Sequence, residues 1–240
     1  MNIVLLMMGG NGIRVGTPVP KQFINIDGMP IFAYIMQALN DSDSVDKIVA
    51  VTHRDWLEYA EEWKDNIKAE KVHAIVQGGN TRSESVKNGL ISVADIAVAR
   101  DVILIHDATH PYVDDEGMKE VAAAVQEYGG ATLGEFQYDT CYKMDEDGMI
   151  SQVVDRKAVV AGASPEAFRF GDIYEIYMKS SDKELEAMTS AGAIALAYGI
   201  QMKVIPARVL NLKITYKEDI ELFNKLAKTY FFQSSKKAKV

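Results

Sequence analysis

Glycines and two cations gather in one short segment near the amino terminus, and their spacing suits the binding of a phosphate. The segment MGGNGIRVGTPVPKQF (Met8–Phe23) contains four glycines, one arginine and one lysine. Glycine lets backbone N–H groups approach an anion because no Cβ stands in the way, and the cations add positive charge where phosphates would lie. The loop contacts that this pattern predicts are Gly9, Gly10, Gly12, Arg14 and Lys21.

The glycine spacing differs from that of two common phosphate-binding loops. A dinucleotide fingerprint G-x-G-x-x-G starting at Gly10 would need its third glycine where Val15 stands, which disfavours an NAD-dependent oxidoreductase. A P-loop would need lysine followed by serine or threonine after the last glycine, and the segment lacks this. The alternative, a flexible turn with two solvated cations, is disfavoured because Pro18 and Pro20 restrain the chain beside Lys21.

The elements that must position this loop alternate between strand and helix patterns, which favours an α/β fold. We expect a Rossmann-like three-layer sandwich with a mostly parallel central sheet, because several strand candidates are apolar at consecutive positions. Ligands of such sheets bind beyond the carboxyl ends of the strands, where the glycine segment follows the first strand. The expected strands are residues 2–7, 47–53, 72–77, 101–107, 130–137 and 201–206, and the expected helices are residues 31–40, 55–66, 83–94, 115–128 and a last helix from Lys217.

One segment interrupts this alternation. YDTCYKMDEDGMISQVVDR (residues 138–156) has two extended stretches about a polar DEDG, which predicts a β-hairpin. The hairpin is either an ordinary edge hairpin or an arm that reaches a second subunit.

Composition limits the possible partners and compartments. The chain has 240 residues, a net charge of −8 and a pI near 5.1, so we expect neither nucleic acid nor a membrane as a partner. The single cysteine, Cys141, suits a reducing compartment, and no secretory or membrane-spanning segment is recognisable, so we expect a cytoplasmic location. Residues 1–232 are expected to form one domain, and residues 233–240 a basic disordered tail.

Six further motifs follow the glycine segment in order, and together they resemble a known family. They are GGNTRSESVKNGL (residues 78–90), HDATHPYV (106–113), DT (139–140), DR (155–156), SPEAF (164–168) and NLKIT (211–215). Over residues 2–230, this set resembles the polyol-phosphate cytidylyltransferases, whose branches act on 2-C-methyl-D-erythritol 4-phosphate or ribitol 5-phosphate. The resemblance implies the nucleotide-diphospho-sugar transferase type of α/β fold, a protruding hairpin arm, and transfer of CMP from CTP to a polyol phosphate with release of pyrophosphate.

The resemblance also implies roles for individual residues on the nucleotide side. Arg14 and Lys21 match the family pair that neutralises charge on the transferring phosphoryl group, so they are the expected catalytic residues. Mg²⁺ is the expected cofactor, with Asp107 as its ligand and as a nucleotide contact; a turn or helix-cap role is the alternative for Asp107. The remaining implied nucleotide contacts are the backbone atoms of Met8, Gly9, Gly10 and Gly12, followed by Gly79, Asn80 and Ser85.

The acceptor side is implied in the same way. In the family the hairpin crosses to the other subunit of a homodimer, so residues 138–156 would be a dimerisation arm, and Thr140 and Arg156 would complete the acceptor site of the neighbouring subunit. An exposed strand lysine is the alternative for Lys213, and a helix residue without a ligand role is the alternative for Ser85. The expected acceptor contacts are His110, Thr140, Arg156, Ser164 and Lys213.

Departures from the family pattern concentrate on this acceptor side. His110 replaces the usual arginine and would be only partly charged near neutral pH. Glu166 brings a negative charge, Ser190 replaces an aspartate, and Asn80 stands where an acid is common. The alternatives left open are therefore a catalytically impaired nucleotide-binding relative and a transferase that uses UTP or ATP with another sugar phosphate.

Two details favour the ribitol branch. They are the double glycine Gly9–Gly10 and the tryptophans of HRDWLEYAEEW (residues 53–63). A place in the hydrophobic core is the alternative for Trp56 and Trp63.

Overall fold

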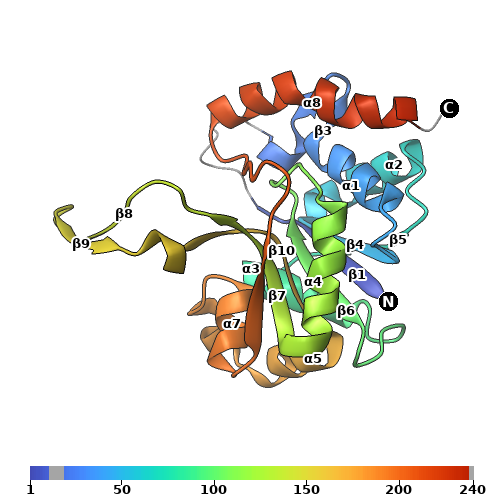
Figure 1. Cartoon of the computed structure of the whole chain (residues 1–240). Helices are drawn as coiled ribbons and strands as arrows, with labels where there is room; N and C mark the ends of the chain where they lie inside the picture. The colour runs from blue at the N-terminus through green and yellow to red at the C-terminus, as the bar shows by residue number, and fades with distance from the viewer. Residues whose placement is uncertain (11–18, 238–240) are drawn as a thin grey trace.

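A seven-stranded sheet forms the middle layer of the part of the chain that the structure describes, residues 1–10 and 19–237 (Figure 1). The structure is a computed structural model. The strand order is β11-β7-β10-β6-β1-β4-β5. The strands are β1 (Asn2–Met8), β4 (Lys47–Thr52), β5 (Val72–Gln77), β6 (Val102–Asp107), β7 (Gly129–Phe136), β10 (Val160–Arg169) and β11 (Gln201–Pro206).

Parallel pairing dominates this sheet, which confirms the predicted fold class. β1 pairs in parallel with both β4 and β6, and β4–β5 and β7–β11 are also parallel pairs. Val4, Leu5 and Leu6 of β1 are completely buried. Because β1 is covered on both faces, its residues are apolar at consecutive positions, and burying each such side chain contributes about 1.5–3 kcal/mol.

β10 is the strand that the sequence analysis missed. It lies between β6 and β7 and is antiparallel to both. Gly162 and Pro165 weaken its strand pattern, and proline is rare in a central strand because it cannot donate a ladder hydrogen bond. The register against β7 shifts between Gly162 and Glu166, so this irregularity lies where the proline occurs.

Helices cover both faces of the sheet and complete the three layers (Figure 1). One core cluster joins α1, α2, α4 and α8 to the sheet, and a second joins α3, α5, α6 and α7 to its other face. Among the described residues, no helix combines the length and the apolar character needed to cross a bilayer. The helices are α1 (Ile31–Asp41), α2 (Leu57–Asn66), α3 (Arg82–Ile91), α4 (Asp115–Tyr128), α5 (Phe170–Lys179), α6 (Asp182–Glu186), α7 (Ala191–Ala197) and α8 (Lys217–Lys237).

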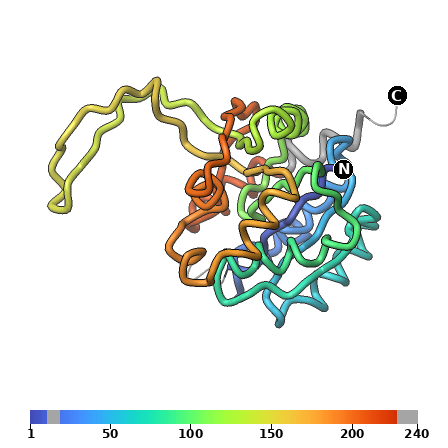
Figure 2. Tube along the Cα trace, turned by 90° about the horizontal axis from the view of Figure 1, so that it is seen from below, coloured from blue at the N-terminus to red at the C-terminus, as the bar shows by residue number. Residues whose placement is uncertain are grey.

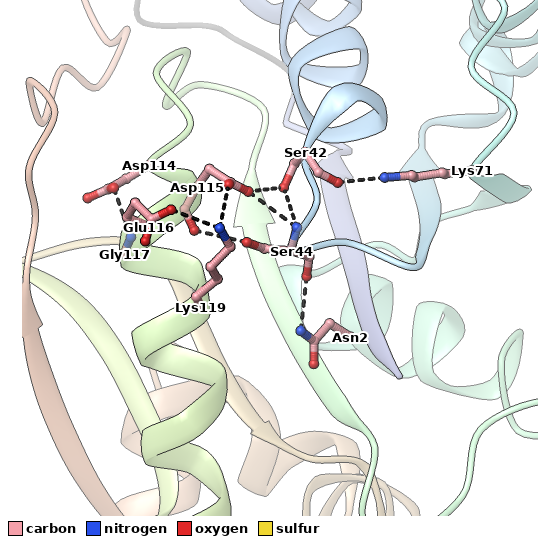
Figure 3. A network of polar contacts seen from close by, with 9 residues as sticks. All are labelled: Asn2, Ser42, Ser44, Lys71, Asp114, Asp115, Glu116, Gly117 and Lys119. Atoms are coloured by element: carbon pink, nitrogen blue, oxygen red, sulfur yellow. Dashed lines mark hydrogen bonds and ion pairs between the residues drawn. The ribbon is translucent and has the colours of Figure 1, made fainter.

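Polar contacts fix the start of α4 against the connection between α1 and β4 (Figure 3). The Asp115 carboxylate accepts a hydrogen bond from the Ser42 hydroxyl, and the Ser44 hydroxyl donates to the Asp115 carbonyl at 3.0 Å. Asn2 binds the Ser44 carbonyl at 2.9 Å, and Lys119 pairs with Asp115 at 3.4 Å. These contacts also hold the end of the segment between β6 and α4 (residues 108–114).

The predicted hairpin is confirmed as an arm that projects from the globular body (Figures 1 and 2). β8 (Cys141–Met144) and β9 (Ile150–Val154) form an antiparallel pair of their own. Gly148 adopts a φ of 81° at the turn, where the Asp145 carboxylate accepts the Met149 N–H at 2.9 Å. Large apolar side chains along the arm are exposed, among them Tyr138, Met144, Ile150 and Val153.

The end of the chain differs from the expected disordered tail. α8 runs to Lys237, so residues 233–237 continue this helix, whereas residues 238–240 lie outside the described residues. The local sequence is compatible with a helix here, because no glycine or proline interrupts the chain after Lys217.

Short elements complete the chain. They are the 3-10 turns η2 (Lys21–Phe23), η3 (Arg54–Trp56) and η4 (Arg156–Ala158), and the small hairpin of β2 (Asn25–Ile26) and β3 (Met29–Pro30).

Candidate active site

Two cavities of similar size share a wall that contains Arg82 and Asp107. The glycine-loop cavity has a volume of about 380 Å³ and is lined by Met7, Gly9, Gly10, Lys21, Gln22, Gly79, Asn80, Thr81, Arg82, Ser85, Asp107 and Thr109. The Lys213 cavity has a volume of about 390 Å³ and is lined by Arg82, Ile105, Asp107, His110, Thr132, Gly162, Ala163, Ser164, Glu166, Thr189, Ser190 and Lys213. Both extend from the carboxyl ends of parallel strands, where ligands of such sheets bind.

The start of the glycine segment lines the glycine-loop cavity. β1 ends at Met8, whose side chain is buried, and Gly9 and Gly10 line the cavity directly after it. The predicted contacts Gly12 and Arg14 lie outside the described residues.

The turn between β5 and α3 forms the opposite wall. The Ser85 hydroxyl accepts the Gly79 N–H at 3.0 Å and donates to the Thr81 carbonyl at 2.8 Å. The Glu84 carboxylate accepts the Asn80 N–H at 2.6 Å, and a Cβ at Gly79 would lie 2.2 Å from the Cβ of Glu84. Glycine is therefore needed at position 79, and Ser85 shapes the turn while it also lines the cavity.

Lys21 lines the glycine-loop cavity and is held there by a hydrogen bond and by the packing of its 3-10 turn. Its side chain is largely buried, and its ammonium donates to the Ile214 carbonyl at 2.6 Å. Phe23, at the end of the same 3-10 turn, stacks on Trp56 with ring centroids 4.2 Å apart. Trp56 and Trp63 are partly buried and pack against the hydrophobic core, as the alternative for these tryptophans predicted.

The adjacent Gln22 completes the P-K-Q motif of residues 20–22 in the glycine segment, and the sequence analysis predicted no role for it. Its side chain is 2% exposed, and its amide binds the carbonyls of Met8 and Gly10. The motif was the signal in the sequence, but the partners of the amide depend on the fold.

Asp107 lines both cavities and forms ion pairs with a cation on each side. Its carboxylate accepts from Arg82 at 3.0 Å and from Lys213 at 3.3 Å. Burial opposes ionisation of this carboxyl, but the two cations outweigh burial and lower the pKa of Asp107 to about 2. Asp107 is therefore an anion at neutral pH, with cations on both sides.

His110 lines the Lys213 cavity as a neutral side chain. Burial, followed by the nearby His106 and Lys213, lowers the pKa of His110 to about 4, although Asp107 acts in the opposite direction. The expectation of partial charge near neutral pH is thus corrected: at pH 7 the imidazole carries no charge, so it cannot replace the charge of the arginine usual in the family. The segment that carries it is fixed by the His110 N–H, which donates to the Asp107 carbonyl at 2.9 Å.

This neutral histidine leads to a pH prediction for stability. An unfolded histidine binds a proton near pH 6.5, whereas folded His110 does so only near pH 4. Between pH 6.5 and pH 4 the unfolded chain therefore binds a proton at this histidine that the folded chain does not. The stability that comes from neutral His110 is fully present above pH 6.5 and is lost as the pH falls toward 4, which lowers the free energy of unfolding by up to about 3 kcal/mol. In urea denaturation at pH 7, 6 and 5, His110→Gln is expected to show a smaller fall in unfolding free energy than wild type. His53→Gln, at an exposed histidine, should behave as wild type, and equal pH slopes for His110→Gln and wild type would contradict the prediction.

Ser164 and Glu166 reach the Lys213 cavity from β10. The Ser164 hydroxyl accepts the Asp107 N–H at 3.0 Å, so this side chain supports Asp107 as well as lining the cavity. Glu166 accepts the Gly192 N–H at 3.1 Å. Both contacts depend on the antiparallel strand that the sequence analysis missed.

Lys213 lines the cavity that is named after it, whereas two other predicted acceptor residues line neither cavity of their own chain. The carbonyl of Thr109 accepts the Ile214 N–H at 2.8 Å and fixes the segment that carries Lys213. Thr140 and Arg156 lie on the exposed arm and line neither cavity of their own chain. The Arg156 guanidinium instead donates to the Tyr138 carbonyl at 2.6 Å. The arm points away from the body of its own chain (Figure 2), so the acceptor role of Thr140 and Arg156 concerns the site of a second subunit and stays a prediction.

A family model and two similar curated relatives are all described as cytidylyltransferases. The family model described as 2-C-methyl-D-erythritol 4-phosphate cytidylyltransferase (IspD) matches residues 2–228. The enzyme of that name from Thermotoga neapolitana is 33% identical over 230 residues, which cover 96% of this chain and 98% of the relative. The ribitol-5-phosphate cytidylyltransferase of Streptococcus agalactiae serotype Ia is 29% identical over 227 residues, which cover 94% of this chain and 95% of the relative.

Solved structures are similar in fold. The 4-diphosphocytidyl-2C-methyl-D-erythritol synthase of Anaerococcus prevotii has a TM-score of 0.77 and 20% identity, with coverage of 95% of this chain and 96% of that chain. The 2-C-methyl-D-erythritol 4-phosphate cytidylyltransferase of Francisella tularensis has a TM-score of 0.75 and 23% identity, with coverage of 93% and 98%. At these identities the likeness concerns the fold alone.

Proposed function

The chain belongs to the 2-C-methyl-D-erythritol 4-phosphate cytidylyltransferase (IspD) family, and from this premise we propose how its two cavities divide the substrates. The chain is a cytidylyltransferase that acts on polyol phosphates. The glycine-loop cavity binds CTP, and the Lys213 cavity binds the polyol phosphate. The observation that carries this proposal is the wall that both cavities share at Arg82 and Asp107.

The shared wall suits a direct displacement between two bound substrates. A phosphate oxygen of the acceptor attacks the α-phosphorus of CTP, the new P–O–P bond forms, and the bond to the leaving pyrophosphate breaks. No protein nucleophile is required, so the chain's contribution is positioning and neutralisation of charge. Lys21, at the glycine-loop cavity, supplies one cation; Arg14, outside the described residues, is proposed as the second.

The acceptor side has the chemistry of a polyol site. Hydroxyl side chains of Thr132, Ser164, Thr189 and Ser190 line the Lys213 cavity, and Lys213 supplies positive charge for the phosphate. Neutral His110 offers hydrogen bonds to hydroxyl groups in place of a guanidinium charge. Ribitol 5-phosphate and 2-C-methyl-D-erythritol 4-phosphate are both acceptors of this class.

Mg²⁺ is the proposed cofactor, and Asp107 is the residue that would hold it. One ionised carboxylate at the boundary of both cavities fits an ion that usually binds one or two protein carboxylates together with substrate phosphates. When bound, the ion would neutralise charge on the triphosphate. Within the described residues, no cluster of three or more His, Cys, Asp and Glu side chains is placed to hold a metal by itself.

A homodimer formed through the arm is the proposed assembly. The exposed apolar side chains of residues 138–156 suit burial against a second copy, and this would bring Thr140 and Arg156 to the partner's acceptor cavity. CTP as a substrate and a single free cysteine suit a cytoplasmic location.

A substitution on the arm tests this assembly. Ile150→Asp is expected to weaken the dimer by about a hundredfold, because each protomer would bury an unpaired carboxylate, and to lower turnover in parallel. Sedimentation velocity and pyrophosphate release measure the two effects. Val98→Asp, at an exposed apolar residue in the segment before β6, is the matched control. A wild-type chain that sediments as a monomer would contradict the proposal.

The proposed reaction is tested by pyrophosphate release with Mg²⁺ and each of CTP, UTP and ATP. The acceptors to compare are ribitol 5-phosphate, 2-C-methyl-D-erythritol 4-phosphate, glycerol 3-phosphate, and pentose and hexose phosphates. We expect turnover with CTP and one polyol phosphate. Activity with UTP or ATP alone, or CTP binding without turnover on any acceptor, would contradict the proposal.

A further inference from the structure

Gln22 is a buried polar side chain that no step of the proposed reaction uses. It lies in η2 directly after Lys21, and it lines the glycine-loop cavity although its side chain is only 2% exposed. A buried amide needs hydrogen-bond partners, so those of Gln22 indicate what the residue does.

The partners lie at the other end of the glycine segment. The Nε2 of Gln22 donates to the Met8 carbonyl at 2.6 Å and to the Gly10 carbonyl at 2.8 Å. Because both acceptors are carbonyl oxygens, only the amide nitrogen satisfies them, and this fixes the orientation of the amide. Its Oε1 is buried without a hydrogen-bond partner among the described residues. The polar contacts that Gln22 makes are therefore the two hydrogen bonds that it donates. Without them the Met8 and Gly10 carbonyls would lose a donor, which is unfavourable for a buried acceptor.

The carboxyl-terminal side of this contact is firmly held. The Phe23 N–H donates to the Pro20 carbonyl at 2.8 Å, and the Phe23 ring is buried on Trp56. The Lys21 ammonium binds the Ile214 carbonyl. Gln22 therefore connects the backbone at Met8 and Gly10 to a turn that is packed on the core.

We infer that Gln22 is a positioning residue that clips the start of the glycine segment to its end. The clip places the backbone of Gly9 and Gly10 and the ammonium of Lys21 around one triphosphate. This inference rests on the proposed function, because it assigns CTP to the glycine-loop cavity. Gln22 does not line the Lys213 cavity, so losing the clip affects CTP and leaves acceptor binding unchanged.

Gln22→Glu and Gln22→Leu test the clip. Glutamate keeps the shape but, when ionised, places a carboxylate against two carbonyl oxygens; leucine removes the donor. Each is expected to raise the KM or Kd for CTP about tenfold to a hundredfold, with the acceptor KM within twofold of wild type. Steady-state kinetics, calorimetric titration with CTP and thermal melting of the full chain measure these effects.

The pH dependence separates positioning from loss of structure. A protonated glutamate regains one O–H donor, and burial favours that neutral form. The activity of Gln22→Glu relative to wild type is therefore expected to rise as the pH falls from 8 to 6, whereas that of Gln22→Leu stays constant. Gln126→Glu is the matched control, because exposed Gln126 also donates to a carbonyl, that of Arg100 at 3.0 Å, and lines neither cavity.

Three results would overturn the inference. The first is an unchanged affinity for CTP in whichever variant folds. The second is an equal rise of both KM values together with a lowered melting temperature, which would indicate a merely structural role. In both cases wild-type turnover would leave the proposed function intact. The third is a wild-type chain that neither binds CTP nor turns over, which would overturn the proposed function and this inference together.

Discussion

Replacing Lys21 with alanine is expected to lower kcat by about 10²–10³-fold, by analogy with the loss of other preorganised charge-stabilising groups. The ammonium lies at the glycine-loop cavity, held by the Ile214 carbonyl and by a turn whose Phe23 packs on Trp56. Charge shifts over the phosphoryl oxygens and onto the leaving pyrophosphate during the displacement, so the loss of a cation there should appear in kcat more than in the KM for the acceptor. Single-turnover rates and steady-state kinetics with CTP measure it.

Lys183→Ala is the control for this prediction. Lys183 is an exposed lysine of α6 that lines neither cavity, so its replacement should leave kcat within twofold of wild type. A Lys21→Ala enzyme that keeps wild-type kcat would contradict the catalytic assignment. A rise in the KM for CTP with kcat unchanged would show that Lys21 binds the nucleotide without stabilising the transition state.

Asp107→Asn is expected to have the second largest effect, a fall in kcat/KM of about a hundredfold. Asparagine keeps the shape of the side chain but removes the charge that balances Arg82 at 3.0 Å and Lys213 at 3.3 Å. It also removes the carboxylate proposed to hold Mg²⁺, so the Mg²⁺ concentration needed for half-maximal rate should rise. Because the pKa of Asp107 is about 2, the carboxylate is ionised across pH 5–9, and wild-type rates in that range should show no acidic limb from this group.

Asp182→Asn provides the matched control, since exposed Asp182 forms a comparable ion pair with Lys87 at 3.7 Å but lies outside both cavities. Titration of Mg²⁺ against rate for the two variants and wild type makes the comparison. An Asp107→Asn enzyme with wild-type kcat/KM and wild-type Mg²⁺ dependence would contradict both roles assigned to the carboxylate.

The residues that depart from the family pattern lie mainly at one of the two cavities. Gly9, Gly10 and Lys21 line the glycine-loop cavity, and the Met8 carbonyl accepts a hydrogen bond from Gln22 beside it. His110 and Glu166 line the Lys213 cavity, so both departures change the side of the shared wall that is proposed to bind the acceptor. A cytidylyl-transfer centre with an altered acceptor pocket is the economical account of this separation.

Local patterns in the sequence determined much of the fold. The consecutive apolar residues of β1, followed directly by glycines, predicted a buried strand that ends in a ligand loop, because strand burial and glycine freedom act over a few residues. The hairpin of residues 138–156 was equally local, since its turn chemistry lies within DEDG. The six ordered motifs then indicated the family, and with it some of the residues that line the two cavities: Gly79, Asn80, Ser85, Asp107, His110, Ser164 and Lys213.

Tertiary structure decided what depends on distant parts of the chain. β10 is stabilised by pairing with β6 and β7 despite Gly162 and Pro165, and no local pattern contains that pairing. The loss of charge on His110 comes from burial, and the partners of Gln22 are backbone carbonyls whose approach requires the folded loop. The physical reason is the same in each case: strand and turn propensities are properties of adjacent residues, whereas burial, electrostatic shifts and hydrogen bonds across loops exist only once the chain has folded.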